Sequence, residues 1–92
     1  MANQVLTPET MQELRRGNEV NYQGWKILDR WAVNFPDELK QLEALGFPIL
    51  FHYLSLQQEE ELEAILNNQD KSLAEHEVLE LNGINMQVPG IS

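Results

Sequence analysis

The sequence has no cysteine, few basic residues and no long apolar run. Without cysteine there is no disulfide framework, no thiol nucleophile and no zinc site built on thiolates. This fits a reducing compartment, and we expect a cytoplasmic protein. The most apolar stretch, residues 47–56, is interrupted by His52 and Ser55 and is too short to span a bilayer. The first residues lack the basic and apolar segments of a signal peptide.

Basic side chains are outnumbered by acidic ones, 6 to 15, which gives a net charge of −9. The excess is uneven, because residues 1–45 carry a net charge of −2 and residues 46–92 carry −7. Nucleic acids and anionic membranes both require a basic surface, and the sequence offers none. We therefore expect no direct nucleic-acid binding and no membrane partner.

At 92 residues the chain has the length of one domain, and we expect residues 1–92 to form a single small helical domain. The first predicted helix spans about residues 8–33. Thr7 is a favourable N-cap and Pro8 suits the first helical position. Apolar residues recur at helical spacing, but the stripe shifts around the axis after Val20. Either one long helix buries two faces or the chain bends near residues 17–18, and we favour a continuous or slightly kinked helix.

Two further helices are predicted by the Phe-Pro pairs at residues 35–36 and 47–48, because proline ends one helix and can open the next. The predicted spans are about 36–45 and 48–67. Gly46 is suited to the position just after the end of a helix. These two helices and the first would form a three-helix core.

A β-hairpin is predicted at the C-terminus, with strands at about residues 77–81 and 84–88. Asn82-Gly83 lies between two runs of alternating apolar and polar residues, which is a strong short-range hairpin signal. The segment from Ser72 to Glu75 also resembles a capping box, which would give a short helical turn. The predicted fold class is therefore mainly α, of the α+β type.

No arrangement of residues indicates catalysis. His52 has no second metal ligand at helical spacing, and His76 lies in a polar stretch beside Glu75 and Glu77, where we expect it to be exposed. The sequence has no glycine-rich phosphate loop, dinucleotide fingerprint or nucleophile motif. We therefore expect a non-enzymatic protein without a metal or cofactor.

The third predicted helix carries a run of acids that could bind a partner: Glu59, Glu60, Glu61 and Glu63. No base lies between Lys40 and Lys71, so these acids cannot pair with lysine within their own helix. They also lie toward the helix C-terminus, where the helix dipole disfavours negative charge. Bases of the first helix or an external basic protein should compensate them, and we favour the first helix.

Aromatic residues supply a second candidate surface, made of Tyr22, Trp25 and Trp31. They fall on more than one face of the first helix. Either the hairpin and the third helix cover both faces, or an exposed aromatic patch marks an interface.

Two functions fit these features. The first is a small protein-interaction or adaptor module that could be a homodimer. The alternative is an acidic inhibitor or nucleic-acid mimic that binds a basic nucleic-acid-binding or defence protein.

Overall fold

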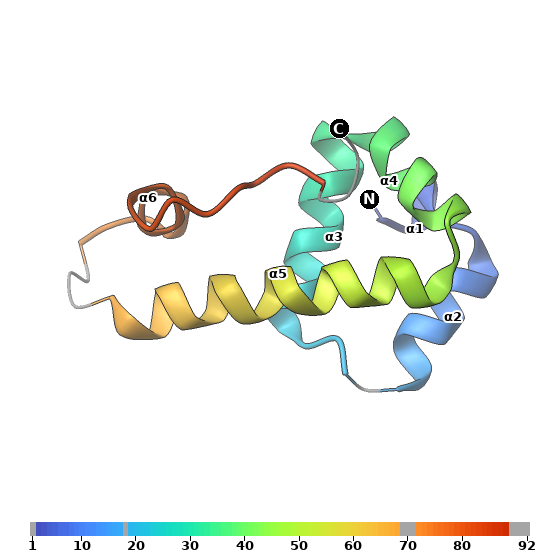
Figure 1. The fold of residues 1–92 in the computed structure, drawn as a ribbon, viewed down its shortest axis with the longest axis horizontal. Coiled ribbons are helices and arrows are strands. Elements are labelled where there is room, and N and C mark those ends of the chain that lie inside the picture. The colour runs from blue at the N-terminus through green and yellow to red at the C-terminus, as the bar shows by residue number, and fades with distance from the viewer. Residues whose placement is uncertain (1, 18, 69–71, 89–92) are drawn as a thin grey trace.

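The computed structural model describes residues 2–17, 19–68 and 72–88. In these ranges the chain forms helices and no β-strand (Figure 1). The helices are α1 (Ala2–Val5), α2 (Pro8–Arg16), α3 (Tyr22–Asn34), α4 (Pro36–Ala44), α5 (Phe47–Asn67) and α6 (Glu75–Leu81). None of these described helices is both long enough and apolar enough to cross a membrane.

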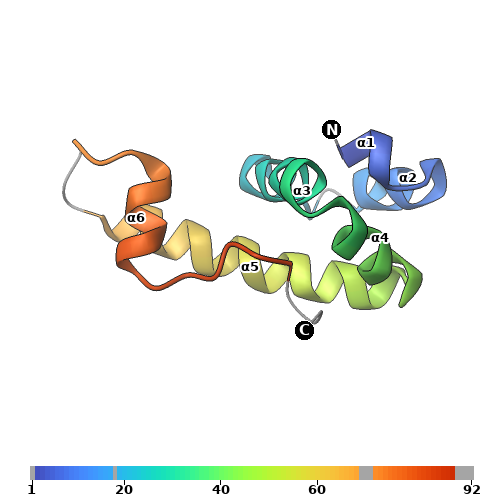
Figure 2. The ribbon, with the colours of Figure 1, turned by 90° about the horizontal axis from the view of Figure 1, so that it is seen from above.

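The longest helix, α5, runs along the length of the molecule (Figure 1). Helices α1 to α4 lie on one side of its N-terminal half, and α6 lies near its C-terminal end (Figure 2). Helices α4 and α5 match the predicted spans to within one residue. Gly46 separates them and has a φ of 117°, a conformation that favours glycine.

The prediction of one helix over residues 8–33 is wrong, because α2 and α3 are separate. Helix α3 has its own N-cap, in which the side chain of Asn21 accepts a hydrogen bond from the N–H of Gly24 at 3.1 Å. Gln58 of α5 then binds the preceding backbone. Its Oε1 accepts from the N–H of Asn21 at 3.2 Å, and its Nε2 donates to the carbonyl of Glu19 at 3.3 Å. The break is thus stabilised by a distant helix, which no local pattern reveals.

The predicted C-terminal β-hairpin is also wrong. Its first strand, residues 77–81, belongs to α6, and residues 84–88 form no strand, with a bend at Gln87. Helix α6 begins at Glu75, and Ser72 is not its N-cap. Instead, the carboxylate of Glu77 accepts from the N–H of Ala74 at 3.3 Å, which is one half of a capping box.

The Asn82-Gly83 pair ends a helix here and does not make a hairpin turn. Gly83 has a φ of 69° and its N–H donates to the carbonyl of Glu80 at 3.0 Å. The N–H of Ile84 donates to the carbonyl of Leu79, also at 3.0 Å, which completes a Schellman motif. A hairpin turn and a Schellman helix end both need a glycine in the left-handed conformation. The Asn-Gly dipeptide alone therefore does not distinguish the two.

Two apolar clusters stabilise the fold. The main core joins α2, α3, α4 and the first half of α5 and includes these fully buried side chains: Leu14, Ile27, Leu28, Trp31, Leu39, Leu42, Leu50 and Leu54. The second cluster is smaller and holds α6 against the second half of α5, through Ala64, Val78 and Leu79. Val88 reaches back into the main core, so the C-terminal segment connects the two clusters.

Gly24 lies where α3 crosses α5, and replacing it by alanine should destabilise the protein. The added Cβ would lie 2.1 Å from Oε1 of Gln58 and 2.7 Å from Cγ1 of Val20. Relief of this clash would displace the Gln58 bonds, at a cost of about 1–3 kcal/mol in the free energy of unfolding. Urea denaturation followed by circular dichroism measures this cost.

Gly17→Ala is the matched control for Gly24→Ala. The nearest atom to its Cβ is Cγ of Glu19 at 3.9 Å, and Gly17 has a right-handed φ of −82°. This variant should be neutral or stabilising by up to about 1 kcal/mol. Equal destabilisation by the two variants would contradict the role given to Gly24.

Candidate functional site

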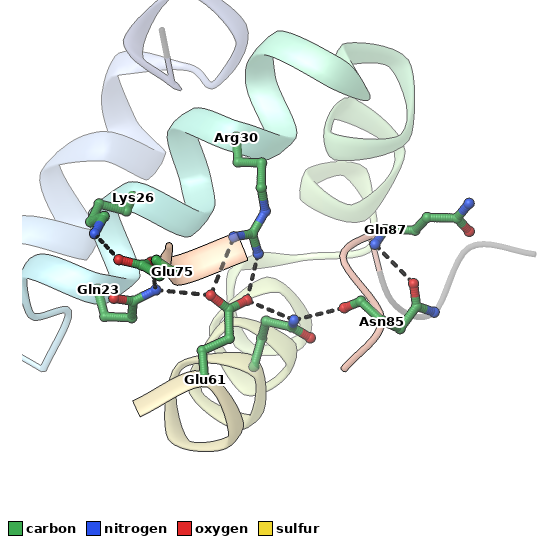
Figure 3. Close-up of polar contacts among 8 residues, drawn as sticks. Gln23, Lys26, Arg30, Glu61, Glu75, Asn85 and Gln87 are labelled. Atoms are coloured by element: carbon green, nitrogen blue, oxygen red, sulfur yellow. Dashed lines mark hydrogen bonds and ion pairs between the residues drawn. The ribbon is translucent and has the colours of Figure 1, made fainter. Parts of the chain in front are cut away.

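A buried ion pair lies between the two apolar clusters. Glu61 of α5 is fully buried, and the guanidinium of Arg30 from α3 binds its carboxylate in a bidentate manner (Figure 3). Arg30 Nη1 lies 3.2 Å from Oε1, and Nη2 lies 2.5 Å from Oε2. Nε2 of Gln23 and Nε2 of Gln57 each donate to the same carboxylate at 2.8 Å. Four hydrogen bonds therefore compensate the desolvation of this charge.

The two glutamines also join the pair to the C-terminal part of the chain. Nε2 of Gln23 donates to Oε1 of Glu75 at 3.0 Å, and Nε2 of Gln57 donates to the carbonyl of Asn85 at 2.8 Å (Figure 3). Each amide thus donates one proton to Glu61 and the other to the C-terminal part of the chain, residues 75–88. The same polar layer positions both α6 and the segment that follows it.

A second ion pair lies at the edge of this layer, between Nζ of Lys26 and Oε2 of Glu75 at 2.5 Å. Burial raises the pKa of Glu75, but the hydrogen bonds from Lys26 and Gln23 and the charges of Lys26 and Arg30 outweigh it. The pKa of this carboxyl is therefore lowered. Of the four acids that we expected bases of the first predicted helix to compensate, only Glu61 has such a pair among the described residues, with Arg30.

The outer face of α5 differs from its buried face. The outer α5 face is defined by exposed residues on one side of the helix, which are Ile49, His52, Leu56, Glu59, Glu60 and Glu63. Ile49 is 40% exposed and Leu56 is 47% exposed. In the described part of the chain, no ion pair involves any of the three carboxylates.

The outer α5 face is hollowed beside Leu56. A hollow of about 360 Å³ is lined by Tyr53, Leu56, Gln57, Glu59, Glu60 and Glu63. A second hollow of about 240 Å³ shares two of these glutamates, Glu60 and Glu63. It is also lined by Ala64 and Asn67 of α5 and by Asn82 and Ile84, which follow α6. The exposed leucine and the three carboxylates therefore border a concave surface.

The structure separates the residues predicted to bind a partner. Of the four acids, Glu61 lies in the interior and the other three lie on the outer α5 face. Trp31 is fully buried in the main core and Trp25 packs partly buried against it. Tyr22 is 78% exposed, with Nζ of Lys26 at 5.1 Å from its ring centre. The three aromatics do not form one exposed patch.

Sequence reasoning missed the roles of Gln23 and Gln57. A signal for the buried layer was present, because Glu61 continues the buried stripe of α5 formed by Leu50, Leu54 and Gln57 at helical spacing. Gln23, Lys26 and Arg30 likewise share one face of α3, three and four residues apart. A polar side chain on a buried stripe requires a hydrogen-bond partner. Here the polar residues of the α3 stripe are the partners of those on the α5 stripe.

Comparison of the chain with protein-family models, with curated proteins and with solved structures finds no match. The described residues contain no group of three or more histidine, cysteine, aspartate or glutamate side chains that could hold a metal ion.

Replacing Glu61 by glutamine should destabilise the protein strongly. The variant leaves the Arg30 guanidinium buried without a counter-charge and turns an amide N–H₂ toward other donors. We expect a loss of about 3 kcal/mol in the free energy of unfolding, measured by urea denaturation. Glu63→Gln makes the same change on the exposed side of α5 and should stay within about 0.5 kcal/mol of the parent. Similar losses in both variants would rule out the buried network as a stabilising element.

The lowered pKa of Glu75 predicts a specific pH dependence. Because the pKa is lower in the folded state, the carboxylate stabilises the fold above its ordinary pKa, and this is lost as the pH falls through the folded pKa. The stability difference between the parent and Glu75→Gln should therefore be largest near neutral pH and shrink in acid. Urea titrations at a series of pH values measure it, with Glu80→Gln as the control for charge loss from α6. A difference that stays constant into acid would contradict the shift.

Proposed function

We propose that this chain is a non-enzymatic protein-interaction module, and that it docks its partner on the outer α5 face. The observation that carries this proposal is an exposed leucine, Leu56, in a hollow bordered by three carboxylates that form no ion pair with the described residues. The cytoplasm is the location that we propose for this interaction, as the lack of cysteine suggests.

An apolar anchor at the centre of a polar rim is the usual anatomy of a protein interface. Leu56 lies in the hollow, and Ile49 lies two helical turns before it on the same side of α5. Burying such a side chain on binding gives about 1–3 kcal/mol. The neighbouring carboxylates add electrostatic steering of the encounter. These features support docking by a protein.

The partner that we propose is a different protein and not a second copy of the chain. A two-fold dimer through this face would bring two copies of the same acidic patch into one interface, so Glu59, Glu60 and Glu63 would place six like charges close together. The net charge of −9 adds long-range repulsion. Two of the aromatics that suggested a homodimer, Trp25 and Trp31, are partly or fully buried within the chain.

A second candidate function is an acidic inhibitor or nucleic-acid mimic. It is favoured by the three exposed carboxylates, which have no ion pair in the part of the chain that the structure describes. Such a protein would fill a basic groove by charge alone. The two candidates differ in their dependence on apolar contacts. A docking module needs Leu56 and Ile49, whereas a mimic needs the glutamates and tolerates loss of the apolar side chains.

A photo-crosslinking residue at position 56, introduced in the native cell, tests the docking face. Val33 of α3 is an exposed apolar residue away from this face and provides the matched control position. We expect a discrete adduct with one protein from position 56 and none from position 33. The purified partner should then bind Leu56→Ser about tenfold more weakly than the parent chain.

Three outcomes would contradict the docking proposal. These are equal adducts from both positions, no adduct from position 56, or a partner whose affinity is unchanged by Leu56→Ser. A partner lost on replacing Glu59, Glu60 and Glu63 by glutamine, but retained by Leu56→Ser, would favour the acidic mimic. A dimer detected by light scattering, with position 56 crosslinked to itself, would assign the face to self-association.

A further inference from the structure

The outer α5 face is a narrow strip parallel to the helix axis. Its exposed residues recur every three or four positions, from Ile49 through His52, Leu56 and Glu60 to Glu63. At 1.5 Å per residue, this strip is about 21 Å long. That length matches about four turns of another helix lying alongside α5. The second hollow extends the strip toward Asn67 and Ile84.

The strip has two chemically different halves. Its first half carries no acid and contains Ile49, His52 and Leu56, with Tyr53 in the wall of the hollow. Its second half is acidic and contains Glu59, Glu60 and Glu63. These acids lie toward the C-terminal end of α5, which is the negative end of the helix dipole. The dipole therefore increases the negative potential around them. No base occurs between Lys40 and Lys71, so α5 has no positive charge of its own.

From this arrangement we infer that the occupant of the outer α5 face is a cationic amphipathic helix of the partner protein, an inference that rests on the proposed docking function. The helix carries two large apolar side chains that meet Leu56 and Ile49. It also carries two or three lysines or arginines on the same side, about two turns away, that meet Glu59, Glu60 and Glu63.

Charge complementarity selects this occupant over others. Lysine and arginine have apolar stems and charged ends, so they can cover the wall of the hollow while reaching its carboxylates. An acidic helix, a nucleic acid or an anionic membrane would be repelled by the same carboxylates. An added β-strand would need an open sheet edge, and the described residues contain no strand.

Three synthetic helical peptides of about four turns can test this inference against the isotope-labelled full chain by NMR titration. The first has leucines in one half and lysines in the other, all on one side of the helix. The second moves its lysines to the opposite side, and the third has glutamate in place of lysine. We expect the first to bind at least about fivefold more tightly than either control, with salt-sensitive affinity and with shifts at Leu56, Glu60 and Glu63.

Variants of the chain then locate the contact. The double variant Glu60→Gln and Glu63→Gln should bind the first peptide about fivefold more weakly. The double variant Asp37→Asn and Glu38→Gln removes the same charge from α4 and should bind as the parent does. Asp37, Glu60 and Glu63 are exposed and Glu38 is half-buried, and circular dichroism checks that each variant is folded.

The inference is overturned if the first peptide binds no better than the other two, or if both double variants weaken binding equally. It is also overturned if the shifts fall away from the outer α5 face. Should the peptides fail while position 56 still crosslinks a partner whose affinity depends on Leu56, the docking function stands and its occupant is not this helix. Failure of both experiments rejects both proposals.

Discussion

The fold depends on one buried ion pair, Arg30 with Glu61. The carboxylate of Glu61 is fully buried, so its charge is tolerated only because Arg30 and two glutamine amides bind it. The pair joins α3 to α5 between the two apolar clusters. The smaller cluster has few buried side chains with which to hold α6, and the amides that bind Glu61 also bind Glu75 and the backbone at Asn85. The ion pair therefore organises the contacts that hold the C-terminal part against the main core.

A polar layer serves this purpose differently from an apolar one. Leucines in its place would bury similar area with no desolvation cost, and such replacements are often neutral or stabilising. Apolar contacts, however, leave the angle and register of a short helix weakly defined. Gln23 and Gln57 each have two amide protons, and each divides them between Glu61 and the C-terminal part. We interpret the layer as a device that fixes where α6 and residues 84–88 lie.

The sequence predicted the elements whose ends are determined locally. The proline and glycine residues near positions 36 and 47 act on the neighbouring backbone, so α4 and α5 were found. The break before α3 depends on Gln58, thirty-seven residues from Asn21, and was missed. The hairpin was wrong because a left-handed glycine serves both a hairpin and a helix end, and only the packing of Leu79 and Ile84 in the second cluster distinguishes them. The candidate acids were correctly located on α5. Which of them is buried and which are exposed depends on the side of α5 that α3 covers, and the sequence of α5 alone does not give this.

This separation explains why the acids of one helix have different consequences. Glu61 continues the buried stripe of α5, and the fold surrounds it with donors that also position α6. Glu59, Glu60 and Glu63 lie on the other side of the same helix, where no basic side chain pairs with them among the described residues. Exposed carboxylates need no partner for stability, because water solvates them. Carboxylates that serve solubility alone, however, need not border an exposed leucine in a hollow. The exposed apolar side chain is the unfavourable feature in water, and the proposed cationic partner would bury it while pairing with the carboxylates beside it.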